Sequence, residues 1–169
     1  MTEKYRWLAA IIAAHPDRKI VGRTRLQKTV KLLQRLGAPI DYDYMIHFYG
    51  PYSEGVQADI CLLEKFGLVE EQACTAQDGS PYFILQATDQ AAALAADAEF
   101  KSFQKDIDLM SETDAVVLEL AATYDAFREM GTQHDAALKR LRRKKGTKCE
   151  KGREQKALAL LDKLGLPHN

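Results

Sequence analysis

Apolar residues along the first half of the chain follow two different periods. Through residue 36 they recur every three or four positions, as Leu26, Val30 and Leu33 do, which is typical of amphipathic helices. From Asp41 the period becomes two, which is typical of a strand, and a helical period then returns before two further strand-like runs. The pattern predicts, in order, helices over 3–15 and 24–36, a strand over 41–49, a helix over 53–66, and strands over 68–75 and 82–86.

Turn and capping signals mark the ends of these elements. Gly50-Pro51 ends the first predicted strand, because proline has no N–H to extend a ladder. Thr24 and Ser53 are the expected N-caps of the helices that they precede. Asp78-Gly79 is a hairpin turn signal between the last two strands. The order helix, helix, strand, helix, hairpin predicts a winged helix-turn-helix domain over residues 1–87, with the hairpin as the wing.

The second half of the chain has only helical patterns. Thr88 is the expected cap of an alanine-rich helix over 88–109. Ser111 and Asp114 fit a capping box, which predicts a further helix that ends at Gly131. Leucines at helical spacing predict a last helix near 150–164.

These patterns together predict a mainly α protein with a small β-hairpin, in the α+β class. The predicted winged helix-turn-helix is followed by a C-terminal helical extension over residues 88–169. We expect a homodimer that forms through the helix over 88–109 or the helix after it. The extension includes a basic segment at 139–156.

Charge is balanced over the 169 residues but unevenly placed along them. The formal net charge is zero, whereas residues 87–135 carry 3 basic and 11 acidic side chains and residues 136–169 carry 11 and 3. Such asymmetry indicates either an interaction tail or a contact between oppositely charged helices. The three cysteines, Cys61, Cys74 and Cys149, have no C-x-x-C spacing, which argues against a disulfide framework and a zinc knuckle. With no apolar run of membrane length and no signal-type segment, we expect a cytoplasmic protein with no membrane partner.

Two basic stretches are the candidate contacts for nucleic-acid phosphates. One is the face of the second helix that lies away from its leucines, and the other is the run at residues 139–145; either could instead be an ordinary solvated face. The helix over 53–66 offers three carboxylates and only one lysine, so direct base reading through it is disfavoured. The candidate nucleic-acid-binding residues are Arg23, Arg25, Lys28, Lys31, Ser53, Gln57, Arg140, Arg142, Arg143, Lys144 and Lys145.

The alternative is a protein partner that docks on the acidic face of the helix over 53–66 and on the tyrosines before it. Its candidate contacts are Tyr49, Tyr52, Glu54, Asp59 and Glu64. Catalysis finds little support, because the four histidines are scattered and neither an H-E-x-x-H motif nor a glycine-rich phosphate loop is present. We therefore expect no enzyme activity, no cofactor and no metal site.

Three short motifs resemble those of a known group. They are R-T-R-L-Q-K at residues 23–28, Y-G-P-Y-S at 49–53 and D-I-C-L-L-E-K-F-G-L-V at 59–69. Over roughly residues 5–87 the chain resembles bacterial winged-helix proteins related to the Panacea-type antitoxin domain. Its alanine-rich second half and basic end depart from that pattern.

The resemblance implies a non-enzymatic prokaryotic protein that works by binding. Some Panacea-type proteins neutralise a partner toxin, and winged helices often regulate transcription. The expected function is therefore a nucleic-acid-associated regulator that contacts phosphates through basic residues. The alternative is an antitoxin-type regulator that neutralises or escorts a partner protein.

Overall fold

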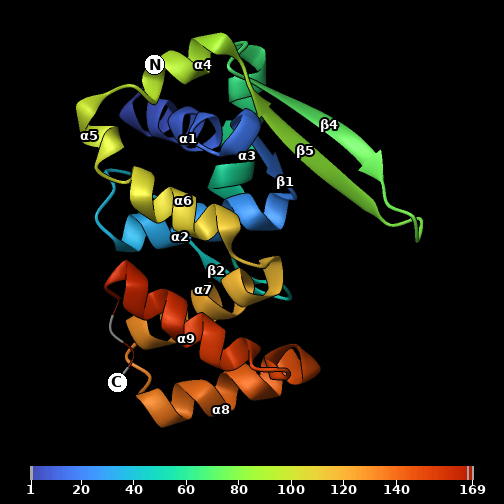
Figure 1. Ribbon diagram of the computed structural model, residues 1–169, viewed down its shortest axis with the longest axis vertical. Helices are drawn as coiled ribbons and strands as arrows, with labels where there is room; N and C mark the ends of the chain where they lie inside the picture. The colour runs from blue at the N-terminus through green and yellow to red at the C-terminus, as the bar shows by residue number, and fades with distance from the viewer. Residues whose placement is uncertain (1, 167, 169) are drawn as a thin grey trace.

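The computed structural model describes residues 2–166 and 168 and has an α+β architecture dominated by helices (Figure 1). The helices are α1 (Glu3–Ala13), α2 (Arg23–Arg35), α3 (Glu54–Lys65), α4 (Asp89–Leu94), α5 (Ala98–Lys101), α6 (Gln104–Glu112), α7 (Ala115–Glu129), α8 (His134–Lys145) and α9 (Arg153–Leu164), with 3-10 turns η1 (Pro16–Arg18) and η2 (Gly146–Cys149). The strands are β1 (Lys19–Val21), β2 (Met45–His47), β3 (Gly50–Tyr52), β4 (Val69–Thr75) and β5 (Pro81–Ala87). None of the helices in this described part is both long and apolar enough to cross a membrane.

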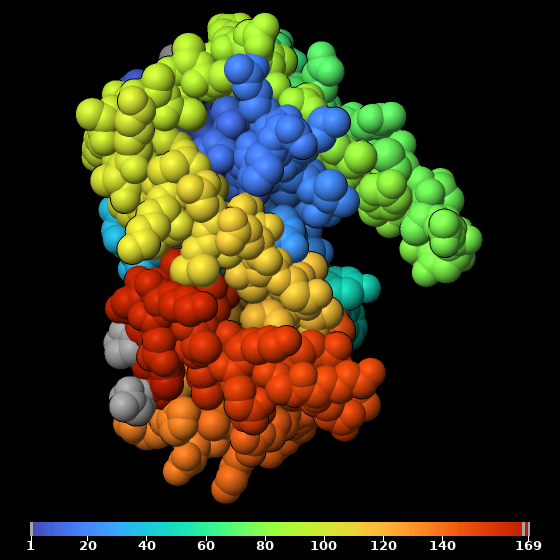
Figure 2. All heavy atoms as spheres, viewed as in Figure 1, coloured from blue at the N-terminus to red at the C-terminus, as the bar shows by residue number. Residues whose placement is uncertain are grey.

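The expected long hairpin is confirmed as β4 and β5. The two strands pair antiparallel from Val69↔Ala87 to Thr75↔Pro81, and β1 adds to the other edge of β5 in the sheet order β1-β5-β4. The turn is the predicted one, since Gly79 has a φ of 85° and the Asp78 side chain accepts a hydrogen bond from the Ser80 N–H at 2.9 Å. The far end of the hairpin projects from the body of the molecule (Figures 1 and 2).

The predicted strand over 41–49 is wrong for most of its length, because only Met45–His47 forms a strand. A side chain replaces the ladder at Tyr42, whose N–H donates to Gln34 Oε1 at 3.0 Å and whose carbonyl accepts from Gln34 Nε2 at 3.1 Å. The alternation of this segment therefore does not reflect continuous sheet. Its short strand β2 pairs with β3, with His47 opposite Gly50.

Two expected helix caps are confirmed. The Ser53 hydroxyl accepts a hydrogen bond from the Val56 N–H at the start of α3, and the Thr88 hydroxyl accepts one from Ala91 at the start of α4. Both residues have extended backbone angles, as N-caps do. Local sequence thus sets the start of both helices.

Two other expected starts are wrong. Thr24 lies inside α2, which begins at Arg23 after Gly22, whose φ of 93° favours glycine. Ser111 belongs to α6, and the cap of α7 is Asp114 alone, which accepts from the Val116 N–H at 2.9 Å. A short carboxylate side chain satisfies the free N–H groups of α7 without the second half of a capping box.

The single helix expected over 88–109 is wrong, because this stretch forms α4, α5 and the start of α6. Phe100 and Phe103 pack on Trp7 of α1, with ring centroids 5.1 and 5.4 Å away, and Ile107 is fully buried. The turns between the three helices let these residues follow the surface of α1. These larger apolar side chains of the stretch proposed for dimer contact are therefore packed within the same chain.

Helix α7 lies in the centre of the molecule, between α2 and β3 on one side and α8 and α9 on the other (Figure 1). Every residue from Val117 to Phe127 is buried, as expected for a helix that is packed all round. The second helix proposed for dimer contact is thus also internal. Its carboxylates at Glu119, Asp125 and Glu129 face basic residues of α2 and α8.

Candidate docking site at the aromatic turn

The most exposed large apolar side chain of the described residues lies in the turn between β2 and β3. Phe48 is 82% exposed, Tyr49 is 60% exposed and Met45 is 58% exposed. The His47 ring lies 5.6 Å from the ring of Phe48 and 5.7 Å from that of Tyr52. We call residues 45–52 the aromatic turn.

The backbone of the aromatic turn is fixed by α2. Gln27 Nε2 donates to the Ser53 carbonyl at 2.9 Å, and Gln27 Oε1 accepts from the Ser53 N–H at 2.9 Å. Lys28 Nζ donates to the Pro51 carbonyl at 2.7 Å, although Lys28 is only 2% exposed. The L-Q-K and Y-G-P-Y-S motifs are therefore two halves of one structural unit.

We expect Gln27→Ala to lower the free energy of unfolding by about 2 to 4 kcal/mol, because it leaves two buried backbone groups of Ser53 without partners. Urea unfolding measures this value. Gln34→Ala is the matched control, since Gln34 makes the same pair of bonds to Tyr42 in a partly exposed place and should cost about 1 kcal/mol. Equal losses in the two variants would contradict the role given to Gln27.

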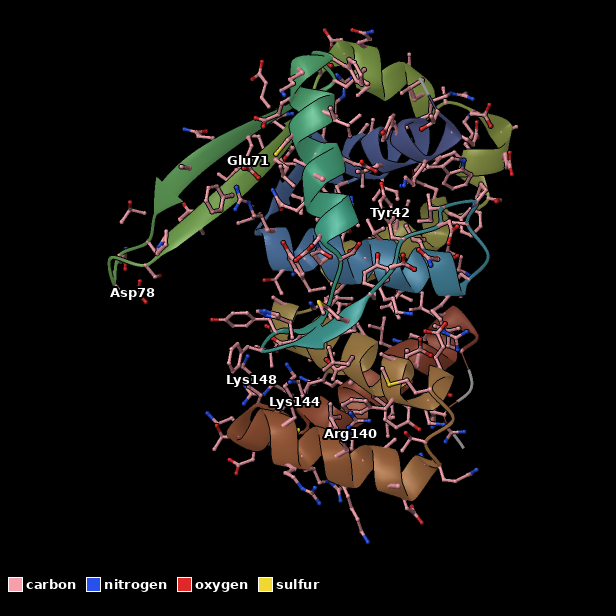
Figure 3. The ribbon with its side chains drawn as sticks, turned by 180° about the vertical axis from the view of Figure 1, so that it is seen from behind. Tyr42, Glu71, Asp78, Arg140, Lys144 and Lys148 are labelled. Carbon is pink, nitrogen blue, oxygen red and sulfur yellow. The ribbon has the colours of Figure 1, made fainter. Side chains whose placement is uncertain are left out.

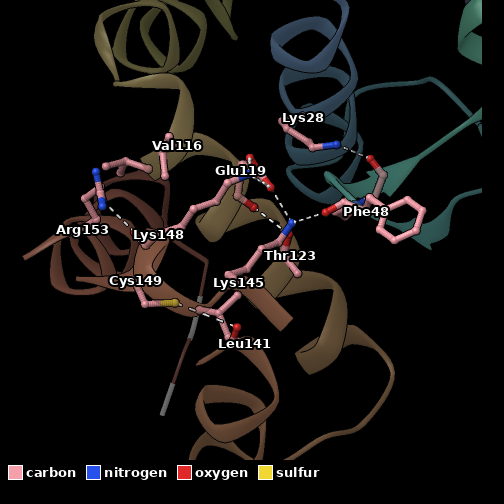
Figure 4. Close-up of polar contacts among 12 residues, drawn as sticks. Lys28, Phe48, Val116, Glu119, Thr123, Leu141, Lys145, Lys148, Cys149 and Arg153 are labelled. Atoms are coloured by element: carbon pink, nitrogen blue, oxygen red, sulfur yellow. Dashed lines mark hydrogen bonds and ion pairs between the residues drawn. The ribbon is translucent and has the colours of Figure 1, made fainter. Parts of the chain in front are cut away.

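The other side of the turn is held by α7 and α8 (Figure 4). Lys145 Nζ donates to the Phe48 carbonyl at 2.9 Å and also pairs with the Glu119 carboxylate. Lys148 Nζ lies 3.1 Å from Glu119 Oε1, and Figure 3 shows it beside the aromatic turn. We call Lys28, Lys145, Lys148 and Glu119 the lysine cluster. Lys145 and Lys148 share the Glu119 carboxylate, and Lys28 binds the Pro51 carbonyl beside them.

Burial changes the proton affinity of Lys28 and Lys145. It lowers the pKa of Lys28 from 10.5 to about 8, and the nearby Glu119 carboxylate only partly opposes the change. Burial also lowers the pKa of Lys145, and the hydrogen bond that Lys145 donates to Glu119 opposes this change. Because the folded pKa of Lys28 lies below its unfolded value of 10.5, the unfolded chain binds this proton more readily between those two pH values. The stability that depends on Lys28 is therefore fully present above pH 10.5 and is lost as the pH falls from 10.5 through about 8.

Gly50 is packed where no side chain fits. A Cβ atom there would lie 2.4 Å from Thr123 Oγ1 and 3.4 Å from Lys28 Cε, and the φ of Gly50 is 91°. The turn thus passes between α2 and α7 at the closest approach that a backbone allows. This contact and the hydrogen bonds from Lys28 and Lys145 hold the backbone of the turn against α2 and α7.

A pocket of about 340 Å³ lies between the aromatic turn and the start of α2. Its walls are Arg23, Thr24, Gln27, Lys28, His47, Tyr49, Gly50 and Tyr52. Arg23 Nε donates to Glu71 Oε2 of the long hairpin at 3.0 Å, and the Arg23 guanidinium stacks 3.5 Å above the Phe83 ring. The pocket and the exposed aromatic side chains form one continuous candidate site.

The basic face expected on α2 does not face solvent. Lys28 and Lys31 are buried, and Lys31 pairs with Glu129 of α7 at 2.5 Å. Arg25 donates to the carbonyls of Met110 and Thr113 at 3.0 and 2.9 Å. The prediction that these side chains form an open phosphate-contacting stripe is therefore wrong, because the acidic α7 and the α6–α7 junction cover them.

The predicted basic run at 139–145 is only partly free. Lys145 is buried, Arg142 Nε donates to Glu154 Oε2 at 2.8 Å, and Arg140 lies 4.2 Å from the Phe127 ring centroid. Arg143 and Lys144 are exposed and form no ion pair with any described residue. The structure thus brings two of the predicted cations, Lys28 and Lys145, to the same turn, where both are buried. Arg140, Arg142, Arg143 and Lys144 stay exposed on α8.

Some of the residues predicted for protein binding are exposed, and one is buried. Tyr49 and Tyr52 belong to the aromatic turn, and Glu54 and Glu64 are exposed on α3. Asp59 is buried and accepts a hydrogen bond from the Tyr42 hydroxyl at 2.7 Å, so it is not available to a partner.

Ser53, predicted to meet nucleic acid, is buried as the cap of α3, so that prediction is wrong. Gln57 is half-buried on α3. Sequence reasoning also missed Phe48 and Glu119. A strand over 41–49 puts Phe48 on the same side as Ile46, and no local signal shows that Glu119 pairs with Lys145 and Lys148.

Within the described residues, no group of three or more histidine, cysteine, aspartate or glutamate side chains could hold a metal ion. The histidine of the aromatic turn has aromatic neighbours, Phe48 and Tyr52.

Comparison with known proteins yields one relative without an assigned activity. No family model matches the chain. A segment of 53 residues is 38% identical to the uncharacterized protein YwgA of Bacillus subtilis (strain 168). The match spans about a third of each protein, 31% of this chain and 32% of YwgA, so this chain is similar to YwgA over that segment.

Proposed function

We propose that this protein is a non-enzymatic regulator that binds a partner protein through the aromatic turn. The observation that carries the proposal is Phe48, which is 82% exposed on a backbone held by buried lysines. Exposed aromatic side chains in rigid positions are typical centres of protein interfaces. Because the turn is already ordered, binding through it costs little conformational entropy.

The surroundings of the turn favour protein over duplex DNA. Helix α3 exposes Glu54 and Glu64, which repel phosphate groups. Of the cations on α2, Arg23 pairs with Glu71, Lys31 pairs with Glu129, and Lys28 is buried behind the turn, so none of the three is an unpaired cation on the outer surface that a duplex would meet. A protein partner can meet apolar and acidic surface together, and a phosphate backbone cannot.

The arrangement of the first half supports an interpretation as a winged helix. The order α1, β1, α2, α3 and the β4–β5 hairpin, with the sheet order β1-β5-β4, is compatible with that fold. In this interpretation α3 would be the recognition helix and the long hairpin the wing. An antitoxin-type regulator, which neutralises or escorts its partner, is then the most specific form of the proposal.

Nucleic-acid binding is the second candidate, and exposed cations on α8 favour it. Lys139, Arg143 and Lys144 face solvent there. Three phosphate contacts of this kind give weak binding that depends strongly on salt and not on sequence. We therefore expect no saturable binding of a random 20-bp duplex below about 10 μM at physiological salt.

The test begins with the genes beside this one: a toxin-like reading frame there is expected, its absence would count against the antitoxin form of the proposal, and its product is the partner to be tested. The wild-type protein should restore growth when the two are co-expressed and should co-purify with it. Phe48→Ser and Tyr49→Ser should each weaken binding at least about tenfold, or about 1.4 kcal/mol, in a calorimetric titration.

The matched control is Phe66→Ser at the end of α3, where the phenylalanine is 53% exposed. It should bind the partner as the wild type does. If Phe66→Ser weakens binding and Phe48→Ser does not, the docking surface is wrongly placed. Tight, salt-sensitive binding of the random duplex, lost when the α8 cations are replaced by alanine, would favour the second candidate instead.

A further inference from the structure

We propose that the pocket beside the aromatic turn binds a small phosphate ester that carries a ring, such as a nucleoside monophosphate. The proposal rests on six residues that line the pocket: Arg23, Thr24, Lys28, His47, Tyr49 and Tyr52. Its volume of about 340 Å³ lies in the range of small-ligand sites. This site goes beyond the proposed docking function and does not depend on it.

The charge of the pocket selects an anion. Its walls include the cations Arg23 and Lys28 and no carboxylate, whereas four other hollows of the described chain each include at least one carboxylate. Lys28 lines the pocket, donates to the Pro51 carbonyl and forms no ion pair with a described acidic side chain, so no direct carboxylate contact cancels its charge. Behind the turn, Lys145 and Lys148 exceed the charge of Glu119, which leaves the region positive.

The polar groups of the walls suit a phosphate. Arg23 uses Nε and Nη2 on Glu71, and its Nη1 has no hydrogen-bond partner among the described residues. The Thr24 hydroxyl also forms no hydrogen bond with the described residues. A phosphate accepts hydrogen bonds from guanidinium, ammonium and hydroxyl groups, and residues with all three kinds of group line this pocket.

The aromatic walls suit a planar ring. His47, Tyr49 and Tyr52 come from the two sides of the aromatic turn, opposite the start of α2. Because the turn is fixed at Gly50 and by Lys28, these rings are positioned before a ligand arrives. Stacking on such a platform tolerates different bases, so the expected class is a ring-bearing phosphate and not one particular base.

The test is a calorimetric titration of the full chain at low salt with AMP, adenosine and inorganic phosphate. AMP should bind saturably with a dissociation constant below about 1 mM, and the other two probes should each bind at least about tenfold more weakly. Absence of saturable AMP binding, or equal affinity for AMP and inorganic phosphate, would overturn the assignment.

Variants locate the bound AMP. Tyr49→Ala and Thr24→Val should each weaken it about three- to tenfold, and Lys28→Met at least about tenfold. Thermal unfolding shows whether each variant is folded. If Lys28→Met does not fold, the test relies on Thr24→Val, which keeps the shape of the side chain and removes only its hydroxyl group. Arg143→Ala removes an exposed cation of α8 and should leave AMP binding unchanged.

An Arg143→Ala protein that binds AMP as weakly as Tyr49→Ala does would indicate diffuse charge attraction and overturn the site. Phe48 is not among the pocket walls, so Phe48→Ser should keep AMP binding while it weakens partner docking. The two proposals can therefore fail separately.

Discussion

Glu119→Gln is expected to lower the free energy of unfolding by about 3 to 5 kcal/mol, since it leaves buried Lys145 without a counter-ion. The side chains of Lys145 and Glu119 are 1% and 5% exposed. Water therefore cannot solvate the Lys145 ammonium in place of the missing carboxylate. Glutamine keeps the size of the side chain and makes the change one of charge. Urea unfolding of the purified variant measures the loss.

A double-mutant cycle separates this charge effect from a loss of packing. If Lys145 destabilises the variant because it is unpaired, Glu119→Gln with Lys145→Met should cost at least about 1.5 kcal/mol less than the sum of the single changes. Asp89→Asn, which removes a carboxylate from a surface ion pair with Arg18, should cost no more than about 0.5 kcal/mol. Strictly additive losses at Glu119 and Lys145 would contradict the cluster as a coupled unit.

The parts of the fold that could be predicted are those with local signals. Ser53 caps α3 through its own hydroxyl, and the Asp78-Gly79 turn closes the hairpin within a few residues. Neither feature depends on where the rest of the chain lies. The α+β class and the amphipathic helices of the first half follow for the same reason.

The basic face of α2 shows why other parts could not be predicted. Helical periodicity places Lys28 and Lys31 away from the leucines, which correctly puts them on a second face but says nothing of what covers it. The cover is α7, whose Glu129 is 98 positions from Lys31. The uneven charge of the sequence indicated a contact between oppositely charged helices as one of two alternatives, and this is the alternative that the structure contains.

The candidate site was also visible only in part. The L-Q-K and Y-G-P-Y-S motifs and Tyr49 were singled out, but their joint role depends on hydrogen bonds across 23 to 26 positions. Phe48 was placed on the same side as Ile46 because a strand was assumed to continue through it. The strand ends at His47, and the turn then directs Phe48 into solvent.

Gly50→Ala is expected to lower the free energy of unfolding by about 2 to 5 kcal/mol. A backbone with a φ of 91° costs an alanine about 1 to 2 kcal/mol. The added methyl group would also lie 2.4 Å from Thr123 Oγ1, and such overpacking costs about 1 to 3 kcal/mol more. Urea unfolding measures the total, and the variant should also bind the partner more weakly, because relief of the contact displaces the aromatic turn.

Gly131→Ala separates these two contributions. Gly131 has the same φ of 91°, but no atom lies within 4 Å of the position that its Cβ would take. It should therefore show only the backbone cost, about 1 to 2 kcal/mol. Thr123→Ala should recover part of the loss in the Gly50→Ala background, since it removes the oxygen that the methyl group meets. If Gly50→Ala and Gly131→Ala are equally destabilised, the close packing of the turn against α7 does not limit this position, and the rigidity on which partner docking depends must have another source.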